Sequence, residues 1–203
     1  MGVRVSLPAP HAAKSDILEH MKDIVQDGAD VLRDSAKPVP EEMFGTPELD
    51  NILKDMADAL DPELEGVALA APQIGVPYRI FIVRMDRVLP PTPCDSLGDP
   101  SAKPNLAVRA PMIDVYINPE IVKTSRRRSL MDEGCLSTRG IYGATLRHDR
   151  ATVRARGPNG SRFERGGGGL LAQIFQHETD HLDGTLFIDH AERLFEIHHE
   201  HTA

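Results

Sequence analysis

The stretch LLAQIFQHETDHLDG, from Leu170 to Gly184, decides the fold that we expect for this chain. Its first residues are largely apolar, which places one side of the segment against a core. The four glycines before it, residues 166–169, indicate a loop. Gly184 is suited to end a helix, because glycine readily takes the left-handed conformation found just after helices. We therefore predict a helix from near Leu170 to Leu182 or Asp183.

Two histidines of this expected helix, His177 and His181, lie four residues apart and so share one face. Two imidazoles in that arrangement can chelate one divalent cation, and Glu178 can reach a water on the cation. A surface helix can carry the same H-E-x-x-H pattern by chance. The apolar residues just upstream favour a site near a core, and the pattern therefore predicts a metal site.

A catalytic metal site of this kind needs a third protein ligand and an open position. Cys135, in the segment EGCLS, is the best candidate, because a thiolate is a good soft ligand. A lone cysteine is more often a small buried apolar residue. The neighbouring Gly134 lets the backbone approach another group closely, which favours a ligand here. The other cysteine, Cys94, lies between prolines, and we expect an unligated thiol in a loop.

Composition narrows the class of protein and its compartment. A chain of 203 residues with average apolar and charged fractions suits one compact domain, which we place at residues 1–203. The formal net charge of −8 disfavours direct binding to DNA or to an anionic membrane, since both attract basic surfaces. No apolar run is long enough to span a bilayer or to act as a secretory signal. We therefore expect a cytoplasmic protein whose substrate is small or peptidic.

Further elements surround the expected metal helix. Thr46 can cap a helix that starts at Pro47 and continues with apolar residues at helical spacing to Leu60. Short segments rich in β-branched residues predict strands at 78–83, 112–118 and 151–156. The proline-rich stretch 89–111 indicates a loop. This irregular order predicts an α+β fold, a single domain of mostly antiparallel sheets packed around the central helix that carries HETDH.

Three segments together resemble the signature motifs of the peptide deformylase family: GVALAAPQ at 66–73, EGCLS at 133–137 and HETDH at 177–181. Their order and spacing also match, and the similarity covers nearly the whole chain. One motif position departs from the pattern, because Ala68 stands where the family normally has a second glycine; alanine there would be strained at positive φ. Tyr142 stands where many bacterial members carry an arginine close to bound peptide.

The resemblance implies a role for each matching residue. Its implied metal ligands are Cys135, His177 and His181, its implied acid/base is Glu178, and its implied oxyanion donors are the Gln73 amide and the Leu136 backbone N–H. The chemistry agrees, because amide hydrolysis needs a nucleophile stronger than neutral water and a divalent cation lowers the pKa of its water to about 7. The carboxyl group of Glu178 can accept that proton and return it to the leaving amine.

Substrate contacts follow from the same resemblance. Backbone groups of Gly66 and Ala68 are expected to bind the peptide in extended form beside a strand. Val67, Leu170 and Ile174 either line the pocket for the methionine side chain or belong to the core, and the sequence favours neither. Two supporting contacts are expected as well: Asp180 with Arg147, and Glu133 with a ligand histidine.

One divalent metal ion per chain is implied, but the two lines of reasoning differ on its identity. One cysteine and two histidines point first to Zn²⁺. The family commonly uses Fe²⁺, which we expect in the cell, with Zn²⁺, Ni²⁺ or Co²⁺ in purified protein. The implied partners are N-formylmethionyl nascent peptides, met at the ribosome exit. The sequence favours neither a monomer nor a dimer.

Two other functions compete with deformylation. A metalloprotease also uses H-E-x-x-H, although the cysteine ligand argues against it. A protease would also need a groove on both sides of the cut bond, whereas a formyl group needs a small closed end. An inactive relative that only binds peptide N-termini or ribosomes is the non-enzymatic alternative. The intact Glu178, Gln73 and three ligand residues disfavour it.

Overall fold

The computed structural model of the protein describes residues 22–89 and 112–196. Cys94 and most of the proline-rich stretch 89–111 therefore lie outside the described residues. No helix within the described ranges is long and apolar enough to cross a membrane.

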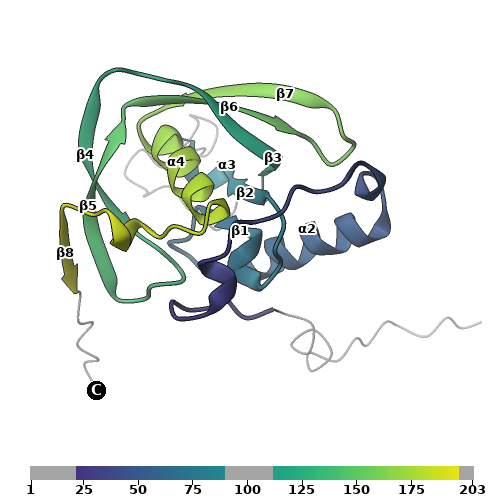
Figure 1. Ribbon diagram of the computed structural model, residues 1–203, viewed down its shortest axis with the longest axis horizontal. Helices are drawn as coiled ribbons and strands as arrows, with labels where there is room; N and C mark the ends of the chain where they lie inside the picture. Colours follow the sequence, from purple (N-terminus) through teal and green to yellow (C-terminus); the bar gives the residue numbers. More distant parts are fainter. Residues whose placement is uncertain (1–21, 90–111, 197–203) are drawn as a thin grey trace, which may run out of the picture.

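Two antiparallel sheets and two long helices form the described part of the chain, which confirms the predicted α+β class (Figure 1). The larger sheet has the strand order β1-β2-β3-β6-β7 and the smaller one β4-β5-β8. The strands are β1 Ala68–Ala70, β2 Ile80–Arg84, β3 Ile113–Thr124, β4 Arg128–Gly134, β5 Ile141–His148, β6 Arg150–Arg156, β7 Arg162–Gly168 and β8 Arg193–Glu196. The helices are α2 Pro47–Leu60, α3 Met85–Val88 and α4 Leu170–Leu182, and short 3₁₀ turns lie at 30–32, 41–43, 71–74 and 187–189.

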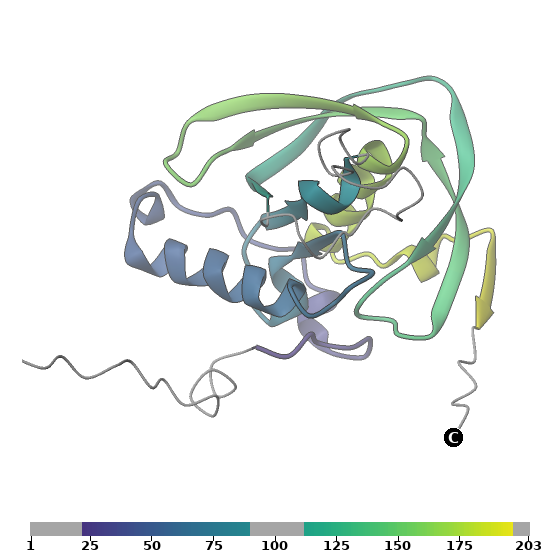
Figure 2. The same ribbon diagram turned by 180° about the vertical axis from the view of Figure 1, so that it is seen from behind.

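The larger sheet separates the two long helices, because its strands alternate their side chains between two cores (Figure 2). Leu69, Ile80 and Ile82 point to the face covered by α2. Ala70 and Phe81 point to the opposite face, where α4 packs. On that second face Tyr116 and Phe175 complete an aromatic cluster with Phe81.

Helix α4 is the central helix, since it contacts strands of both sheets. Its bounds match the prediction, and Gly184 has the expected positive φ of 75°. Helix α2 also begins and ends where its sequence indicated, and the Thr46 side chain accepts a hydrogen bond from Leu49 N–H. These local signals were sufficient because caps and apolar spacing act within a few residues.

The glycine run corrects one prediction. Gly166, Gly167 and Gly168 belong to strand β7 rather than to a loop, and they pair with residues 150–152 of β6. Glycine suits this position because a Cβ on Gly167 would lie 2.8 Å from Leu171 Cγ. The missing side chain lets the first turn of α4 approach the sheet closely.

Candidate metal and peptide site

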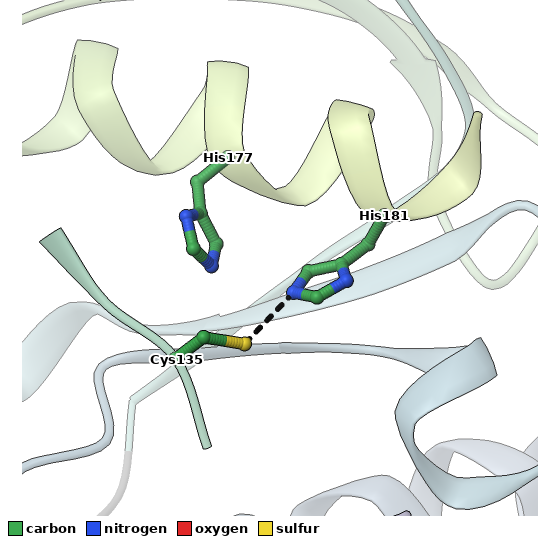
Figure 3. A group of neighbouring side chains, drawn as sticks. All are labelled: Cys135, His177 and His181. Atoms are coloured by element: carbon green, nitrogen blue, oxygen red, sulfur yellow. Dashed lines mark hydrogen bonds between the residues drawn. The ribbon is translucent and has the colours of Figure 1, made fainter. Parts of the chain in front are cut away.

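Three side chains from two distant segments meet beside α4 (Figure 3). Cys135 lies on the turn that follows β4, whereas His177 and His181 project from successive turns of α4. The Cys135 Sγ lies 3.2 Å from His181 Nε2, and one ligand atom from each residue falls within 4.8 Å of the others. One sulfur and two imidazole nitrogens therefore lie close together, although the cysteine is far from both histidines in sequence.

The chemistry of this donor set fits a divalent transition-metal ion. Thiolate and imidazole are the ligands that zinc and iron take in proteins, and three protein ligands leave a further coordination position open. The Nδ1 atom of His177 lies 3.3 Å from Glu133 Oε2, so its Nε2 is left to face the sulfur side. Ligand histidines in metal sites are commonly oriented in this way, by a hydrogen bond from the other ring nitrogen to a carboxylate.

A buried ion network supports the same face of α4. Arg147 donates to both oxygens of Glu133, at 2.7 and 2.9 Å, and to Asp180 Oδ2 at 2.6 Å. Both contacts expected for Asp180 and Glu133 are therefore present. Although burial opposes ionisation, hydrogen bonds from His177 and Arg147 lower the pKa of Glu133 to about 2.

The ligand residues favour an ionised sulfur. Burial alone would raise the pKa of the Cys135 thiol, but the adjacent imidazoles of His181 and His177 bring it well below its usual value. Burial likewise opposes protonation of His177, while the sulfur of Cys135 and the carboxylate of Glu133 raise its pKa. A thiolate is the form of cysteine that binds metal.

Glu178 lies next to the first histidine and faces the same site. Its side chain is buried, and its Oε2 has no hydrogen-bond partner among the described residues. Burial raises the pKa of this carboxyl to about 7. A buried oxygen without a hydrogen-bond partner is unfavourable. Because Glu178 Oε2 lies beside three ligand residues, we expect a group other than the protein, such as a water on the metal ion, to bind it.

Gln73 reaches the site from the 3₁₀ turn that follows β1. Its Nε2 donates to Ser137 Oγ at 3.1 Å and lies 3.4 Å from Cys135 Sγ, while its Oε1 accepts from Ala70 N–H at 2.8 Å. The amide is thus held in one orientation beside the sulfur. Ser137 belongs to the EGCLS motif, but the sequence did not predict that it fixes Gln73. No local sequence signal pairs Gln73 with a residue so far along the chain.

Leu136 follows the ligand cysteine on the same turn. Its carbonyl accepts from Gln26 Nε2 at 3.0 Å, and its N–H donates to no other group in the described part of the chain. Both expected oxyanion donors, Gln73 and Leu136, therefore flank Cys135.

A cavity of about 800 Å³ opens onto these groups. All five residues expected to bind substrate line it, namely Gly66, Val67, Ala68, Leu170 and Ile174. It is also lined by Cys135, Leu136, Gln73, His177 and Glu178. The cavity therefore joins the ligand residues to an apolar wall from α4.

The cavity borders on the edge strand β1 at Ala68, and among the strands that the structure describes β1 pairs with β2 alone. Because Val67 C=O accepts from Arg84 N–H, the alternation of a strand turns the backbone groups of Ala68 to the open side. Gly66 differs, because its N–H donates to Glu63 C=O and its C=O accepts from Arg87 Nη1. Of the two residues expected to offer backbone groups to a peptide, Ala68 is thus placed to do so, whereas those of Gly66 are engaged within the protein.

Tyr142 also lines the cavity and lies opposite Gly134 in the pairing of β4 with β5. Its ring packs on Gly134, where a Cβ would lie 2.8 Å from Tyr142 Cε1. The ring also stacks on Phe195, with centroids 6.2 Å apart. This chain therefore has an aromatic side chain in the cavity wall at the position where many bacterial family members carry an arginine.

A thiolate, two imidazoles and a buried carboxyl group that meet beside a cavity define a metallohydrolase of the class that cleaves amide bonds. A family described as polypeptide deformylase matches residues 21–196, and the chain belongs to this family. Members of the family are hydrolases that remove N-formyl groups from nascent peptides.

Individual relatives agree with this assignment. A peptide deformylase of Halothermothrix orenii is 38% identical over 170 residues, which cover 83% of this chain and 92% of that one. The chloroplastic peptide deformylase 1A of Solanum lycopersicum is 34% identical over 83% of this chain, which spans 59% of its length. The actinonin-bound class I type b enzyme of Acinetobacter baumannii has a TM-score of 0.69 and 28% identity, covering 85% and 99% of the two chains.

Proposed function

We propose that this chain removes the formyl group from N-formylmethionyl peptides and that Cys135, His177 and His181 hold the one metal ion it needs. The observation that carries the proposal is the convergence of these three ligand atoms, together with a cavity that Cys135, His177 and the buried Glu178 line. A divalent cation held by these residues would act as a Lewis acid, which activates water and polarises a carbonyl group.

Glu178 acts as the acid and base of the reaction. It accepts the proton of the attacking water and delivers it to the nitrogen of the leaving amine as formate separates. Its burial and its unpartnered Oε2 support this role, because a carboxyl group kept from water is poised to exchange a proton near neutral pH.

Gln73 and Leu136 stabilise the negative charge that grows on the formyl oxygen. The Gln73 amide is fixed through Ser137 and Ala70, and the Leu136 N–H has no other acceptor among the described residues. Donors that are held in place before the reaction need no reorganisation as charge develops, which is why such groups contribute strongly to catalysis.

The peptide lies along the open edge of β1 and forms its main-chain hydrogen bonds with Ala68. Val67, Leu170 and Ile174 receive the methionine side chain. Their place in the same cavity as the ligand residues supports the pocket role over a purely core role, and Leu170 is 46% exposed.

We further propose Fe²⁺ as the ion bound in the cell, with Zn²⁺, Ni²⁺ or Co²⁺ replacing it in purified protein. The donor set of one thiolate and two imidazoles accepts all four ions. We also propose that residues 1–203 form one catalytic domain, that it works in the cytoplasm, and that it meets its substrate at the ribosome exit. The family match over 21–196 supports the single domain, and the bacterial relatives support the cytoplasm.

The proposal is tested by loading metal-free protein with Fe²⁺ without oxygen and measuring formate release from a formyl-Met tripeptide. Parallel samples receive Zn²⁺, Ni²⁺ or Co²⁺. We expect one metal ion per chain and rapid formate release with Fe²⁺. An acetyl-Met peptide and a peptide with an internal methionine are the controls, and neither should be cleaved.

Two outcomes would contradict the proposal. Cleavage of the internal peptide would indicate a metalloprotease. Metal-loaded protein that leaves formyl peptides untouched would indicate a peptide-binding module. X-ray absorption of the loaded protein, which reports sulfur and nitrogen ligands directly, separates a failed loading from a true loss of activity.

A further inference from the structure

The segment 61–66, which makes up most of the loop between α2 and β1, forms one wall of the cavity through residues 62–66. Four of its six residues, Asp61, Pro62, Leu64 and Glu65, are exposed, and Leu64 is 87% exposed. Apolar packing therefore fixes little of this wall. Its position must depend on polar contacts to the main chain.

Those contacts come from one side chain, Arg87 of α3. Its Nη1 donates to the carbonyls of Glu63 and Gly66, both at 2.6 Å, and lies 3.4 Å from that of Leu60. Its Nη2 donates to the carbonyl of Asp61 at 2.9 Å. One planar guanidinium group thus joins the end of α2, the middle of the loop and Gly66, two residues before β1.

The arrangement is buried and specific to arginine. The Arg87 side chain is 13% exposed, and burial lowers the pKa of its guanidinium group. The carbonyls at the end of a helix lack partners within the helix, so a cation there is stabilising. A guanidinium group carries several N–H donors in a fixed fork and so reaches carbonyls in different directions. An ammonium group has its donors on one atom and is less suited to this.

A second contact holds the loop from the solvent side. Both terminal nitrogens of the Arg139 guanidinium group, Nη1 and Nη2, donate to the carboxylate of Glu63 from the turn beyond Cys135. Arg139 is 55% exposed, so solvent screens this pair and it contributes little by itself. Asp61 also pairs with Arg84 Nη1 at 2.6 Å, but the Asp61 side chain is 66% exposed, so solvent screens this pair as well. Arg87 is therefore the side chain that holds the main chain of the loop.

The loop lies next to the Leu136 turn, which supplies a proposed oxyanion donor, and leads into Ala68, which is proposed to bind the peptide. A Cβ on Gly66 would lie 3.1 Å from Leu136 Cδ1, so Gly66 packs directly on the oxyanion turn. Gly66 also precedes Ala68, the residue with open-edge backbone groups, by two positions. A shift of the loop would thus change the place where the peptide chain is received.

We propose that Arg87 is a positioning residue for substrate binding: by holding four carbonyls of residues 60–66, it fixes the cavity wall that aligns Ala68 with the peptide. This inference rests on the proposed deformylase function, because it takes the substrate to be an N-formylmethionyl peptide. The alternative is a simple helix cap, which would stabilise α2 without affecting substrate.

The test compares Arg87→Ala with wild type and with Arg156→Ala as a matched control. Arg156 is 19% exposed, donates to the Gly160 carbonyl, pairs with Glu41 and does not line the cavity. For metal-loaded Arg87→Ala we expect KM for a formyl-Met tripeptide to rise about tenfold while kcat changes less than about threefold. The control should leave both constants near wild type.

Hydrogen exchange supplies a readout that does not depend on turnover. The Gly66 N–H donates to Glu63 C=O, and this bond should open more often once Arg87 no longer holds both carbonyls. We expect faster exchange of the 61–66 segment in Arg87→Ala, and no change there in Arg156→Ala. Arg87→Lys, which keeps the charge but not the fork, should give an intermediate KM.

A lowered melting temperature in Arg87→Ala with unchanged KM and unchanged exchange of 61–66 would overturn the inference, since that is the behaviour of a cap alone. If Arg87→Ala does not fold, Arg87→Gln is measured against the same criteria. Wild-type protein without deformylase activity would refute the proposed function, whereas the exchange result would still decide whether Arg87 fixes the loop.

Discussion

Ala68 shows how a departure from a family pattern can be read at the scale of one residue. The motif comparison raised the question of strain, because alanine at positive φ is unfavourable. Ala68 instead lies in strand β1, and Asn118 is the one non-glycine residue with positive φ among those that the structure describes. Extended backbone accepts alanine without cost, so the substitution needs no compensating change.

Restoring the family glycine should therefore weaken the fold slightly. We expect Ala68→Gly to lower the free energy of unfolding by about 0.5–1 kcal/mol, because glycine loses more conformational freedom on entering a strand. Urea denaturation of the metal-loaded protein measures this directly. An increase in stability would mean that Ala68 is strained after all.

At the scale of elements, the end of α4 fixes where the two histidines stand relative to the rest of the chain. Gly184 closes the helix with φ 75°, and a Cβ there would lie 2.5 Å from the carbonyl oxygen of Arg33. Two separate effects thus require glycine, the backbone conformation and the close approach of the N-terminal segment.

Gly184→Ala should destabilise the protein by about 2–4 kcal/mol, since both a left-handed alanine and an overpacked contact are unfavourable. Gly28→Ala is the matched control, because Gly28 has φ 101° but open space around it. Thermal unfolding of both variants separates the two effects. Equal losses for Gly28 and Gly184 would show that the contact with Arg33 contributes nothing.

The elements also show what sequence could and could not predict. Helices α2 and α4 were predicted with their ends, because Thr46 and Gly184 act locally. Strands β1, β4, β5, β7 and β8 were not predicted, since short strands depend on partners distant in sequence. The site residues were found through their motifs, whereas Ser137 and Arg87 have roles that exist only through tertiary contacts.

At the scale of the whole molecule, a buried ion pair links β2 to the helix that follows it. Arg84 donates to both oxygens of Asp86 at 3.0 Å, and the two side chains are 7% and 3% exposed. Burial by itself raises the pKa of Asp86, but the hydrogen bonds from Arg84 and from Met112 N–H outweigh it and lower the pKa. The folded protein therefore holds this proton less tightly than the unfolded chain.

This shift predicts a contribution to acid sensitivity. Stability from Asp86 is fully present above its unfolded pKa of about 3.9 and is lost as pH falls through its lower folded value. We expect Asp86→Asn to lose about 2–3 kcal/mol at pH 7 and to lose less stability than wild type on acidification below about pH 4. Urea unfolding across that pH range tests it. Parallel curves for the two proteins would contradict the assignment.

The central claim is that one ion held by Cys135, His177 and His181 works together with the Glu178 carboxyl group. The most direct test is Glu178→Gln, assayed for bound metal and for formate release on the same sample. We predict one metal ion per chain, as in wild type, with turnover reduced at least about a hundredfold, because an amide cannot carry the proton. A variant that keeps its metal and still releases formate at the wild-type rate would contradict the account.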